Sequence, residues 1–372
     1  MGKGAKEFIE RILNEAGIEI GGENPWDIQV KDERFYGRVL RDGALGLGES
    51  YMDEWWDVES LDEFIKRLLL SKVEKKVKKN LKLMLHYLKA RFLNLQKPQR
   101  AHQVAEKHYN LGNDFYKDML DRNMNYTCAY WKGAKNLDEA QENKLKLVCE
   151  KIELSPGMKV LELGCGWGAF AKYAAENYGV EVVAVNISKA QVEYAREVTK
   201  GLPVEVKLMD WRDVEGVYDR VVSIGIMEHV GYKNYRLYME KVYSLLKDDG
   251  ITLIHTIGGN ISTTTANPWT TKYIFPNGML PSIAQLGRAM EGLFVMEDWH
   301  NFGPDYDKTL MAWYRNFEKN WHKHREKYGD RFYRMWKYFL LSCAGAFRAR
   351  NIQLWQIVFS KKGMVGGYTS IR

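Results

Sequence analysis

The feature that most constrains the fold is a regular alternation of short β-branched runs with helical stretches, which begins near Met158. Five runs are typical of strands: MKVLEL (158–163), VEVVAVN (180–186), VEVKLM (204–209), YDRVVSIG (218–225) and ITLIHTI (251–257). Because strands that alternate with helices pair in parallel, the pattern predicts an α/β fold with a doubly wound, mostly parallel sheet. Two later runs, FVMEDWH and IQLWQIVFS, are expected to complete this sheet as its sixth and seventh strands.

A glycine-rich loop follows the first of these strands directly. Gly164, Gly166 and Gly168 lead into a helical stretch, and glycines permit a tight turn and a close backbone approach to a ligand. The spacing GxGxG is shorter than the GxGxxG dinucleotide fingerprint, and the acid, Glu162, precedes the loop. Taken alone, such a loop also fits a plain tight turn.

Polar residues end the second and third strands. Asn186 ends the second strand, where nucleotide-binding folds often place an acid for the ribose hydroxyls, and an amide can also bond a hydroxyl. Asp210 and Trp211 end the third strand and set a polar group beside a flat ring, which suits an adenine. Since ligands gather at the carboxyl ends of parallel strands, these features together favour S-adenosylmethionine over NAD.

Two further titratable residues fall at the same edge of the predicted sheet. Glu228 follows the fourth strand, and His255 lies near the end of the fifth. Their ordinary alternatives are a helix-start acid and a satisfied core histidine. Their position on the ligand side of the sheet makes them candidates for the site.

The chain before the sheet is predicted to be helical throughout and to form a small domain over residues 1–95. One helix ends at the glycine of FIERILNEAG, and another opens on Ser60 with Glu63 three residues later, as in a capping box. The proline in Lys97-Pro98-Gln99 predicts a linker over 96–104.

The catalytic domain is expected over residues 105–372. Asn136, with Glu139 three residues on, predicts a helix that runs toward Ile152. A long stretch with glycines and aromatic residues, about 258–293, interrupts the alternation and is longer than an ordinary connection. We expect it to be a substrate lid inserted into this domain.

Positive charge is concentrated in one segment, although the net charge of the chain is only +7. Residues 66–100 contain twelve Lys or Arg and one acid, Glu74. Apolar residues recur there every three or four positions, which predicts a helix with one apolar stripe and a basic surround. Such a helix fits the core of a domain, an acidic lipid surface or nucleic acid, and its sequence alone does not distinguish them.

Cysteine usage and hydropathy indicate the cellular compartment in which the protein is expected. The four cysteines lie far apart, without a CxxC pair or a histidine cluster, so we expect neither a disulfide framework nor a metal site. The N-terminal segment is charged within its first apolar turns, unlike a signal peptide, and no stretch has the roughly 20 apolar residues of a membrane span. A reducing cytoplasm fits best.

A series of ordered motifs resembles the cyclopropane fatty acid synthases, over a match from about residue 8 to about residue 360. The related mycolic acid methyltransferases share the catalytic motifs but are shorter at the N-terminus, so the helical domain resembles the phospholipid-acting branch. The motifs are YTCAYW (126–131), VLELGCGWGAF (160–170), MEHVG (227–231), HTIG (255–258), FPNGMLPS (275–282), MEDWHNFGPDYDKTLMAWY (296–314) and CAGAFRARNIQLWQ (343–356).

The resemblance implies a reaction and its requirements. A methyl group passes from S-adenosylmethionine to the cis double bond of an acyl chain in a membrane phospholipid, and loss of a proton closes a cyclopropane ring. Because an alkene is a poor nucleophile, the pocket should align it with the methyl group and exclude water, so it should be apolar and aromatic. The family's proton acceptor is a bound bicarbonate ion.

The resemblance also implies roles for individual residues. Glu228 would accept from the bicarbonate, while His255 and the Tyr306 hydroxyl would donate to it or complete its cradle. Cys128 and Ile257 would contribute backbone groups. Cys343 is a doubtful nucleophile, since direct methyl transfer needs no covalent step, and a buried small hydrophobe is its alternative. The methyl donor would be bound by Tyr126, Thr127, Glu162, Gly164, Cys165, Gly166, Gly168, Asn186, Ile187, Gln191, Asp210 and Trp211.

The implied partners are a bilayer of unsaturated phospholipids and a second copy of the chain. We expect the basic helix over 66–100 to attract acidic headgroups at the inner face of the cell membrane, and the helical domain to orient the pocket or to form a dimer contact. Three alternatives share features with this sequence: an RNA methyltransferase, for which the sequence has no base-reading motif, a non-enzymatic membrane-surface protein, and an acyl methyltransferase that makes a methyl branch. No nucleic acid partner is expected.

Overall fold

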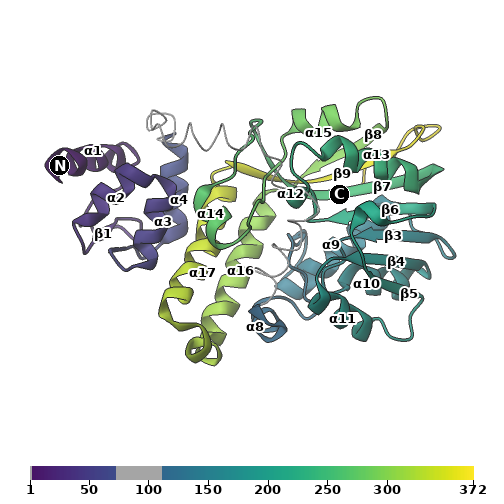
Figure 1. The fold of residues 1–372 in the computed structure, drawn as a ribbon, viewed down its shortest axis with the longest axis horizontal. Helices are drawn as coiled ribbons and strands as arrows, with labels where there is room; N and C mark the ends of the chain where they lie inside the picture. The colour runs from purple at the N-terminus through teal and green to yellow at the C-terminus, as the bar shows by residue number, and fades with distance from the viewer. Residues whose placement is uncertain (1, 73–110) are drawn as a thin grey trace. The chain divides into compact units, whose positions relative to one another are not determined.

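The computed structural model describes residues 2–72 and 111–372, which divide into two compact units (Figure 1). Among the described residues, the first unit comprises 2–72, 264–276 and 306–352, and the second comprises 111–263, 277–305 and 353–372. The linker predicted over 96–104 lies outside the described residues. Residues 264–276 and 306–352, which the sequence assigned to the catalytic domain, group with the N-terminal helices.

Helices dominate the first unit. Its elements are α1 (Gly2–Glu15), α2 (Arg34–Asp42), α3 (Ala44–Met52), α4 (Leu61–Leu70), α14 (Pro268–Tyr273), most of α16 (Pro304–Asn320), η3 (Trp321–Lys323) and α17 (Arg325–Arg348). The prediction of an entirely helical region was wrong in one place, because β1 (Gln29–Val30) pairs antiparallel with β2 (Trp56–Asp57). This pairing holds Trp56 in the core, where its ring packs with Phe64 at 5.1 Å between centroids.

Helix α17 crosses α4 closely. A side chain at Gly345 would collide with the backbone of α4 at Asp62, so glycine is required for this approach. Arg348 then binds Asp62 at 2.6 Å, Glu63 at 3.0 Å and Asp307 at 2.9 Å. Glu63 thus binds Lys66 and Arg348, the Ser60 side chain makes no capping hydrogen bond, and the predicted capping box does not form.

The predicted basic helix over 66–100 was wrong at its start. Helix α4 ends at Leu70, and Lys72 has φ 55°, which leaves the helical region. Two of its cations are already engaged, since Lys66 binds Glu63 at 3.0 Å and the Arg67 guanidinium lies 3.6 Å from the centre of the Trp26 ring. Residues 73–100 lie outside the described residues.

A seven-stranded sheet organises the second unit, as the alternation predicted. Its order is β5-β4-β3-β6-β7-β9-β8, and the labels in Figure 1 follow that order across the sheet. All pairs from β5 to β7 are parallel, whereas β8 and β9 pair antiparallel. The strands are β3 (Lys159–Leu163), β4 (Glu181–Asn186), β5 (Val204–Leu208), β6 (Tyr218–Ile224), β7 (Leu246–Gly259), β8 (Val295–Asn301) and β9 (Ile352–Ser360).

Two apolar cores cover the two faces of the sheet, because alternate strand residues point to opposite sides. On one face Val160, Ala184 and Val222 pack with residues of α9 (Leu137–Lys151), α10 (Ala169–Tyr178) and α11 (Lys189–Val198). On the other face Leu161 and Val183 pack with residues of α13 (Tyr235–Leu245) and α15 (Ile283–Met290). The sheet is therefore doubly wound, as predicted.

Helix α9 begins as the sequence predicted. The Asn136 side chain accepts from the N–H of Glu139 at 3.0 Å, and the helix ends at Lys151 with Ile152 as its cap. The stretch predicted as a lid, 258–293, divides instead. Residues 264–276 belong to the first unit, and α15 buries Leu286 and Ala289 in the core of the sheet, so this last part of the stretch is a core helix.

Candidate active site

The parallel register brings the carboxyl ends of five strands to one edge of the sheet. Leu163 of β3 lies beside Val185 of β4 and Ser223 of β6, and Ile224 lies beside His255 of β7. The residues that follow these strands therefore meet at this edge. They include the glycine loop, Asn186, Asp210 and Glu228, as the sequence predicted.

The glycine loop combines close packing with an open face. All three glycines have positive φ, 77° at Gly164, 52° at Gly166 and 88° at Gly168. A side chain at Gly164 would collide with Ile226, whereas one at Gly166 would meet no atom within 4 Å. The backbone at Gly166 thus faces free space, as a loop that receives a ligand requires. Cys165 instead joins the apolar core, and burial raises the pKa of its thiol.

Asn186 shapes this loop from within the protein. Its side-chain N–H group donates to Gln191 at 2.9 Å and to the carbonyl of Gly166 at 3.3 Å, while its oxygen accepts from the N–H of Ile187 at 2.8 Å. Both ends of the amide are therefore occupied. Asn186 therefore fixes the positions of Gly166 and Gln191, and a role for it toward a ligand stays a prediction.

The pair Asp210 and Trp211 forms the short helix η2 (Trp211–Asp213) after β5. Asp210 caps it by accepting from the N–H of Arg212 at 3.0 Å and binds the Arg212 guanidinium at 2.9 Å. The Trp211 ring meets Tyr238 edge-on at 5.0 Å, and the same guanidinium lies 4.5 Å from its centre. This arrangement holds the indole in place at the edge of the sheet.

Glu162 lies inside the protein, beneath the loop. It is 3% exposed, and its Oε2 is buried without a hydrogen-bond partner among the described residues. Burial raises the pKa of Glu162 to about 8, against the opposing charge of Lys144. Its side chain shares a face of β3 with Val160, which packs toward α9 and α10, so it supports the loop from below.

Glu228 and Ile257 are brought together. Glu228 lies in the one-turn helix α12 (Met227–Val230), and its Oε1 accepts from the N–H of Ile257 at 2.7 Å. Its Oε2 is buried and has no hydrogen-bond partner among the described residues. Burial raises the pKa of Glu228 from 4.5 to about 7, and the N–H of Ile257, the N–H of Glu228 itself and the Thr256 hydroxyl partly oppose this rise. The N–H of Ile257 therefore positions the carboxylate, and a backbone contact from Ile257 to a bound ion stays a prediction.

His255 has one nitrogen satisfied and one not. It is 1% exposed, and its Nδ1 lies 3.3 Å from the amide nitrogen of Gln356 on β9. With the Gln356 amide in this orientation its nitrogen donates, so Nδ1 is assigned as the acceptor and the ring proton is assigned to Nε2. Burial holds the pKa of His255 well below 6.5, so the ring is neutral. Its Nε2 is a buried donor without a partner among the described residues.

The segment that contains Tyr126, Thr127 and Cys128 lies at the same edge. A side chain at Gly225, which follows β6, would come within 3.0 Å of the Thr127 methyl, and Cys128 is buried. The Tyr126 ring lies 5.3 Å from Tyr116, which lies 4.9 Å from Trp167 of the glycine loop. The segment therefore contacts both the loop and the end of β6.

Tyr306 and Cys343 belong to the first unit, so their relation to Glu228 and His255 stays a prediction. Tyr306 stacks on Phe347 at 4.6 Å between ring centroids. Burial raises the pKa of Cys343 to about 12, which keeps the thiol protonated and fits its alternative interpretation as a small buried residue.

Several residues of the site carry no sequence signal. Helix α8 (Asn113–Met119) lies in a segment for which no structure was predicted, yet Asn113 accepts from the indole N–H of Trp167 at 2.9 Å. Gln141 and Lys144 of α9 bind the backbone and hydroxyl of Thr127. Their polar side chains are typical of a solvated helix face, so only tertiary structure shows that they are buried.

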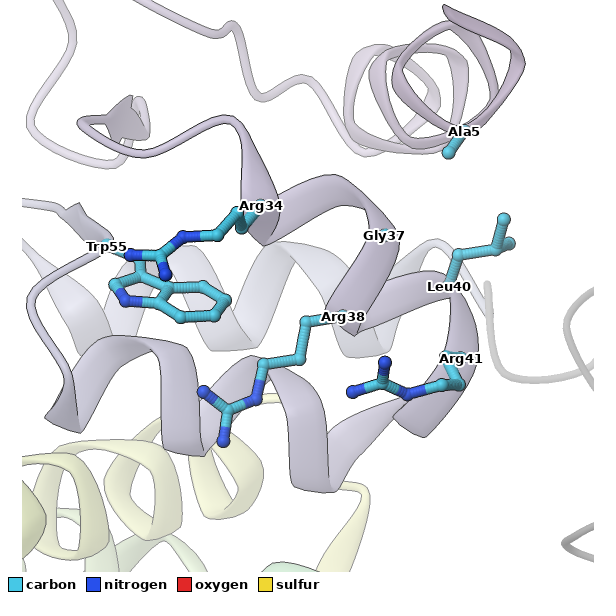
Figure 2. A pocket seen from close by; sticks show the side chains of 7 residues that line it. All are labelled: Ala5, Arg34, Gly37, Arg38, Leu40, Arg41 and Trp55. Atoms are coloured by element: carbon cyan, nitrogen blue, oxygen red, sulfur yellow. The ribbon is translucent and has the colours of Figure 1, made fainter. Parts of the chain in front are cut away.

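A groove of about 610 Å³ lies elsewhere, in the first unit (Figure 2). Each of its three arginines is already paired with an acid: Arg34 with Asp32, Arg38 with Glu49 and Asp53, and Arg41 with Asp42. It therefore lacks the free charge of an anion site. The groove is lined by Ala5, Arg34, Gly37, Arg38, Leu40, Arg41 and Trp55.

Two negative observations apply to residues 2–72 and 111–372. No group of three or more His, Cys, Asp or Glu in these ranges is arranged to hold a metal ion. Every helix described there is too short or too polar to span a bilayer.

Comparison with known proteins shows the family of the chain. Residues 96–357 match the family model of mycolic acid cyclopropane synthetase. The chain belongs to this family. It is 52% identical to the cyclopropane-fatty-acyl-phospholipid synthase of Escherichia coli K12, over 95% of this chain and 93% of the relative. The predicted resemblance is thus confirmed, and the chain is an S-adenosylmethionine-dependent methyltransferase of the cyclopropane synthase class.

One further relative and one solved structure extend the comparison. A probable fatty acid methyltransferase of Pseudomonas putida is 35% identical, over 70% of this chain and 69% of the relative. The crystal structure of mycolic acid cyclopropane synthase CmaA1 complexed with SAH and CTAB has a TM-score of 0.65 and 31% identity, and it covers 70% of this chain and 98% of that one. The family fold is therefore the doubly wound sheet that the alternation predicted.

Proposed function

We propose that this member of the family transfers a methylene group from S-adenosylmethionine to the cis double bond of an unsaturated acyl chain in a phospholipid and forms a cyclopropane ring. The observation that carries the proposal is the pair of buried, unpartnered polar atoms at the carboxyl edge of the sheet, Glu228 Oε2 and His255 Nε2. One accepts and the other donates, so together they match a small polar ligand. The match to the Escherichia coli synthase over 95% of this chain supports the same activity.

The reaction balances without a redox partner. The alkene electrons form a new bond to the methyl carbon as the carbon–sulfur bond breaks, and S-adenosylhomocysteine leaves. A base then removes a proton from the transferred carbon, and the electrons of that C–H bond close the ring. The protein has to align the alkene with the sulfonium and to exclude water from the cation.

The site residues fit a bicarbonate ion, which when bound would supply the base. His255 would donate from Nε2, and its buried, neutral ring holds that proton in place through Gln356. Glu228, with a pKa near 7, would share a proton with the ion, since two unshared negative charges would repel each other. We infer that the Tyr306 hydroxyl and the backbone at Cys128 complete this cradle.

The methyl donor is proposed to lie across the glycine loop. Gly166 offers an open backbone face, Gln191 is buried next to Asn186, and the Asp210–Trp211 pair receives the nucleoside. Tyr126 and Thr127 would close over it. The other members of this predicted set shape the loop from inside, as Glu162 and Cys165 do by their burial.

The lipid substrate implies work at a membrane surface. We propose a cytoplasmic enzyme that reaches the inner face of the cell membrane through the basic segment 66–100 and acts as a homodimer. Sedimentation with vesicles at rising salt tests the first part. Binding that ignores both salt and the fraction of acidic lipid would refute the electrostatic attraction.

The decisive experiment for the activity is incubation with S-adenosylmethionine and vesicles of an unsaturated phospholipid, followed by mass analysis of the fatty acids. A cyclopropane product is heavier than the substrate by one methylene group. A reduced methyl-branched product, which an acyl methyltransferase of the alternative kind would make, is heavier than the cyclopropane product by two further hydrogens. Unmodified fatty acids would refute both, and removal of bicarbonate should suppress cyclopropane formation.

A further inference from the structure

A lysine ammonium is buried inside the second unit, on helix α9. Lys144 is 1% exposed, and its Nζ donates to Asn125 Oδ1 at 2.8 Å and to Thr127 Oγ1 at 3.2 Å. Burial lowers the pKa of Lys144 to about 8, although the charges of Asp121 and Glu162 oppose that shift. A buried ammonium needs such partners, because removing it from water without them is costly.

The same polar network holds the whole turn before Cys128. Gln141, one helical turn before Lys144, donates from its amide to the carbonyl of Thr127 at 2.8 Å. Asp121 accepts from the backbone N–H of Asn125 at 2.7 Å and from its side chain at 2.9 Å. Thr127 is therefore fixed through both its carbonyl and its hydroxyl, and Asn125 through both its backbone and its amide.

The fixed segment lies against the site. The Thr127 methyl packs on Gly225, and the N–H of Gly225 donates to the carbonyl of His255 at 2.8 Å. On the other side, Tyr126 contacts Tyr116, which packs on Trp167 of the glycine loop. A shift of this segment would move the wall that the glycine loop and the end of β6 share.

We propose that Lys144 is a positioning residue for the reaction: its ammonium, with Gln141, holds Asn125 and Thr127 so that the segment 125–128 is pressed against the carboxyl edge of the sheet. The inference rests on the proposed methyl-donor site. Lys144 itself does not touch the reacting atoms. An apolar side chain would fill the same space but would leave Asn125 and Thr127 without their common donor.

The test compares Lys144→Met with Lys146→Met, a control on the same helix whose side chain is 60% exposed. Binding of S-adenosylhomocysteine is measured by calorimetry, and KM and kcat are measured with S-adenosylmethionine and vesicles. We expect the Lys144 variant to raise the dissociation constant and KM about tenfold, the loss typical of a charge-assisted hydrogen bond, with kcat changed less than about threefold. The control should match the wild type.

A double-mutant cycle separates positioning from general stability. Thr127→Val removes the hydroxyl, and its effect on S-adenosylhomocysteine binding should not add to that of Lys144→Met, whereas Thr127→Ser should retain most of the affinity. The proposal would be overturned if the two substitutions lowered S-adenosylhomocysteine affinity additively and in step with a fall in melting temperature. It would also be overturned if Lys144→Met left that affinity unchanged. If Lys144→Met does not fold, Gln141→Leu decides in the same way.

The outcome is distinguishable from failure of the proposed function. Affinity for S-adenosylhomocysteine reports on Lys144 whether or not a cyclopropane forms. A wild-type protein that binds this ligand but modifies no unsaturated lipid would refute the activity. The positioning role of Lys144 could still be measured from the affinity for S-adenosylhomocysteine.

Discussion

The two halves of the candidate site are built differently. On the loop side, Asn186 uses both ends of its amide and Asp210 is paired with Arg212, so the polar groups are satisfied within the protein. On the acid side, Glu228 Oε2 and His255 Nε2 are buried with no such partner among the described residues. Shape defines the first half, whereas the second half holds unused hydrogen-bonding capacity. A buried polar atom left unpaired is costly, so the second half is built for a ligand that pairs with it.

The largest effect is expected for Glu228→Gln. The amide keeps the size of the side chain but lacks the shared proton and the charge, so turnover should fall about 10³-fold while S-adenosylhomocysteine binding stays near wild type. Steady-state kinetics and calorimetry on the same samples measure both. Equal loss of turnover and of S-adenosylhomocysteine binding would assign Glu228 to the loop side, where the methyl donor is proposed to bind. The difference between the two halves would then not hold.

The stability of the acid side should depend on pH. Burial raises the pKa of Glu228 from 4.5 to about 7, so between these values the folded protein binds more protons than the unfolded chain. The free energy of unfolding therefore falls as pH rises through this window, by about 3 kcal/mol. Glu228→Gln should lack this component, seen as a smaller loss between about pH 4 and about pH 8 in denaturant titrations.

A matched control is Glu193→Gln, whose side chain is 62% exposed. The free energy of unfolding of this variant should fall as pH rises by the same amount as that of the wild type. Identical pH profiles for Glu228→Gln and the wild type would show that Glu228 is not desolvated in the folded protein.

Gln356 should matter through His255 alone. Gln356→Leu removes the donor to Nδ1, so the proton of the His255 ring is no longer held on Nε2. Turnover should then fall about thirtyfold with little change in S-adenosylhomocysteine affinity. Gln356→Glu should be as inactive, because its carboxylate would draw the ring proton to Nδ1 and turn Nε2 into an acceptor. If Gln356→Glu retains wild-type turnover, the donor role of Nε2 is wrong.

The smallest effect is expected on the loop side. Gly166→Ala should weaken S-adenosylhomocysteine binding about tenfold, because the new methyl enters the open face and the residue is held at φ 52°. The strain alone should cost about 1–2 kcal/mol of stability. Gly157→Ala, at φ 82° and with no atom within 4 Å of the new carbon, carries the same strain at the opposite end of β3. Equal binding by the two variants would contradict a ligand at Gly166.

Local pattern was enough to predict the sheet and its edge. The five β-branched runs and the two later runs predicted the seven strands of this sheet, and parallel pairing placed Glu228 and His255 at the same edge as the glycine loop. The cap at Asn136 was equally local, since its partner lies three residues away. These features depend on neighbours in sequence or on the general rule for parallel sheets.

Tertiary packing decided the rest. Lys144 lies on a helix where a lysine usually faces water, and only the turn at Asn125 and Thr127 explains its burial. Ser60 and Glu63 have the capping pattern, but Glu63 binds both its neighbour Lys66 and Arg348 from a distant segment. The first unit collects three separate stretches of the chain, and no composition change marks where they begin.

The place of β9 has a consequence for biosynthesis. This strand comes last in the sequence of the strands but lies between β7 and β8, and it carries Gln356 to His255. In a nascent chain that still lacks β9, the edge of β7 is exposed to other strands. Without Gln356, His255 lacks the donor that fixes its tautomer. The enzyme should acquire both its resistance to aggregation and its chemistry in one late step, when that strand enters the sheet.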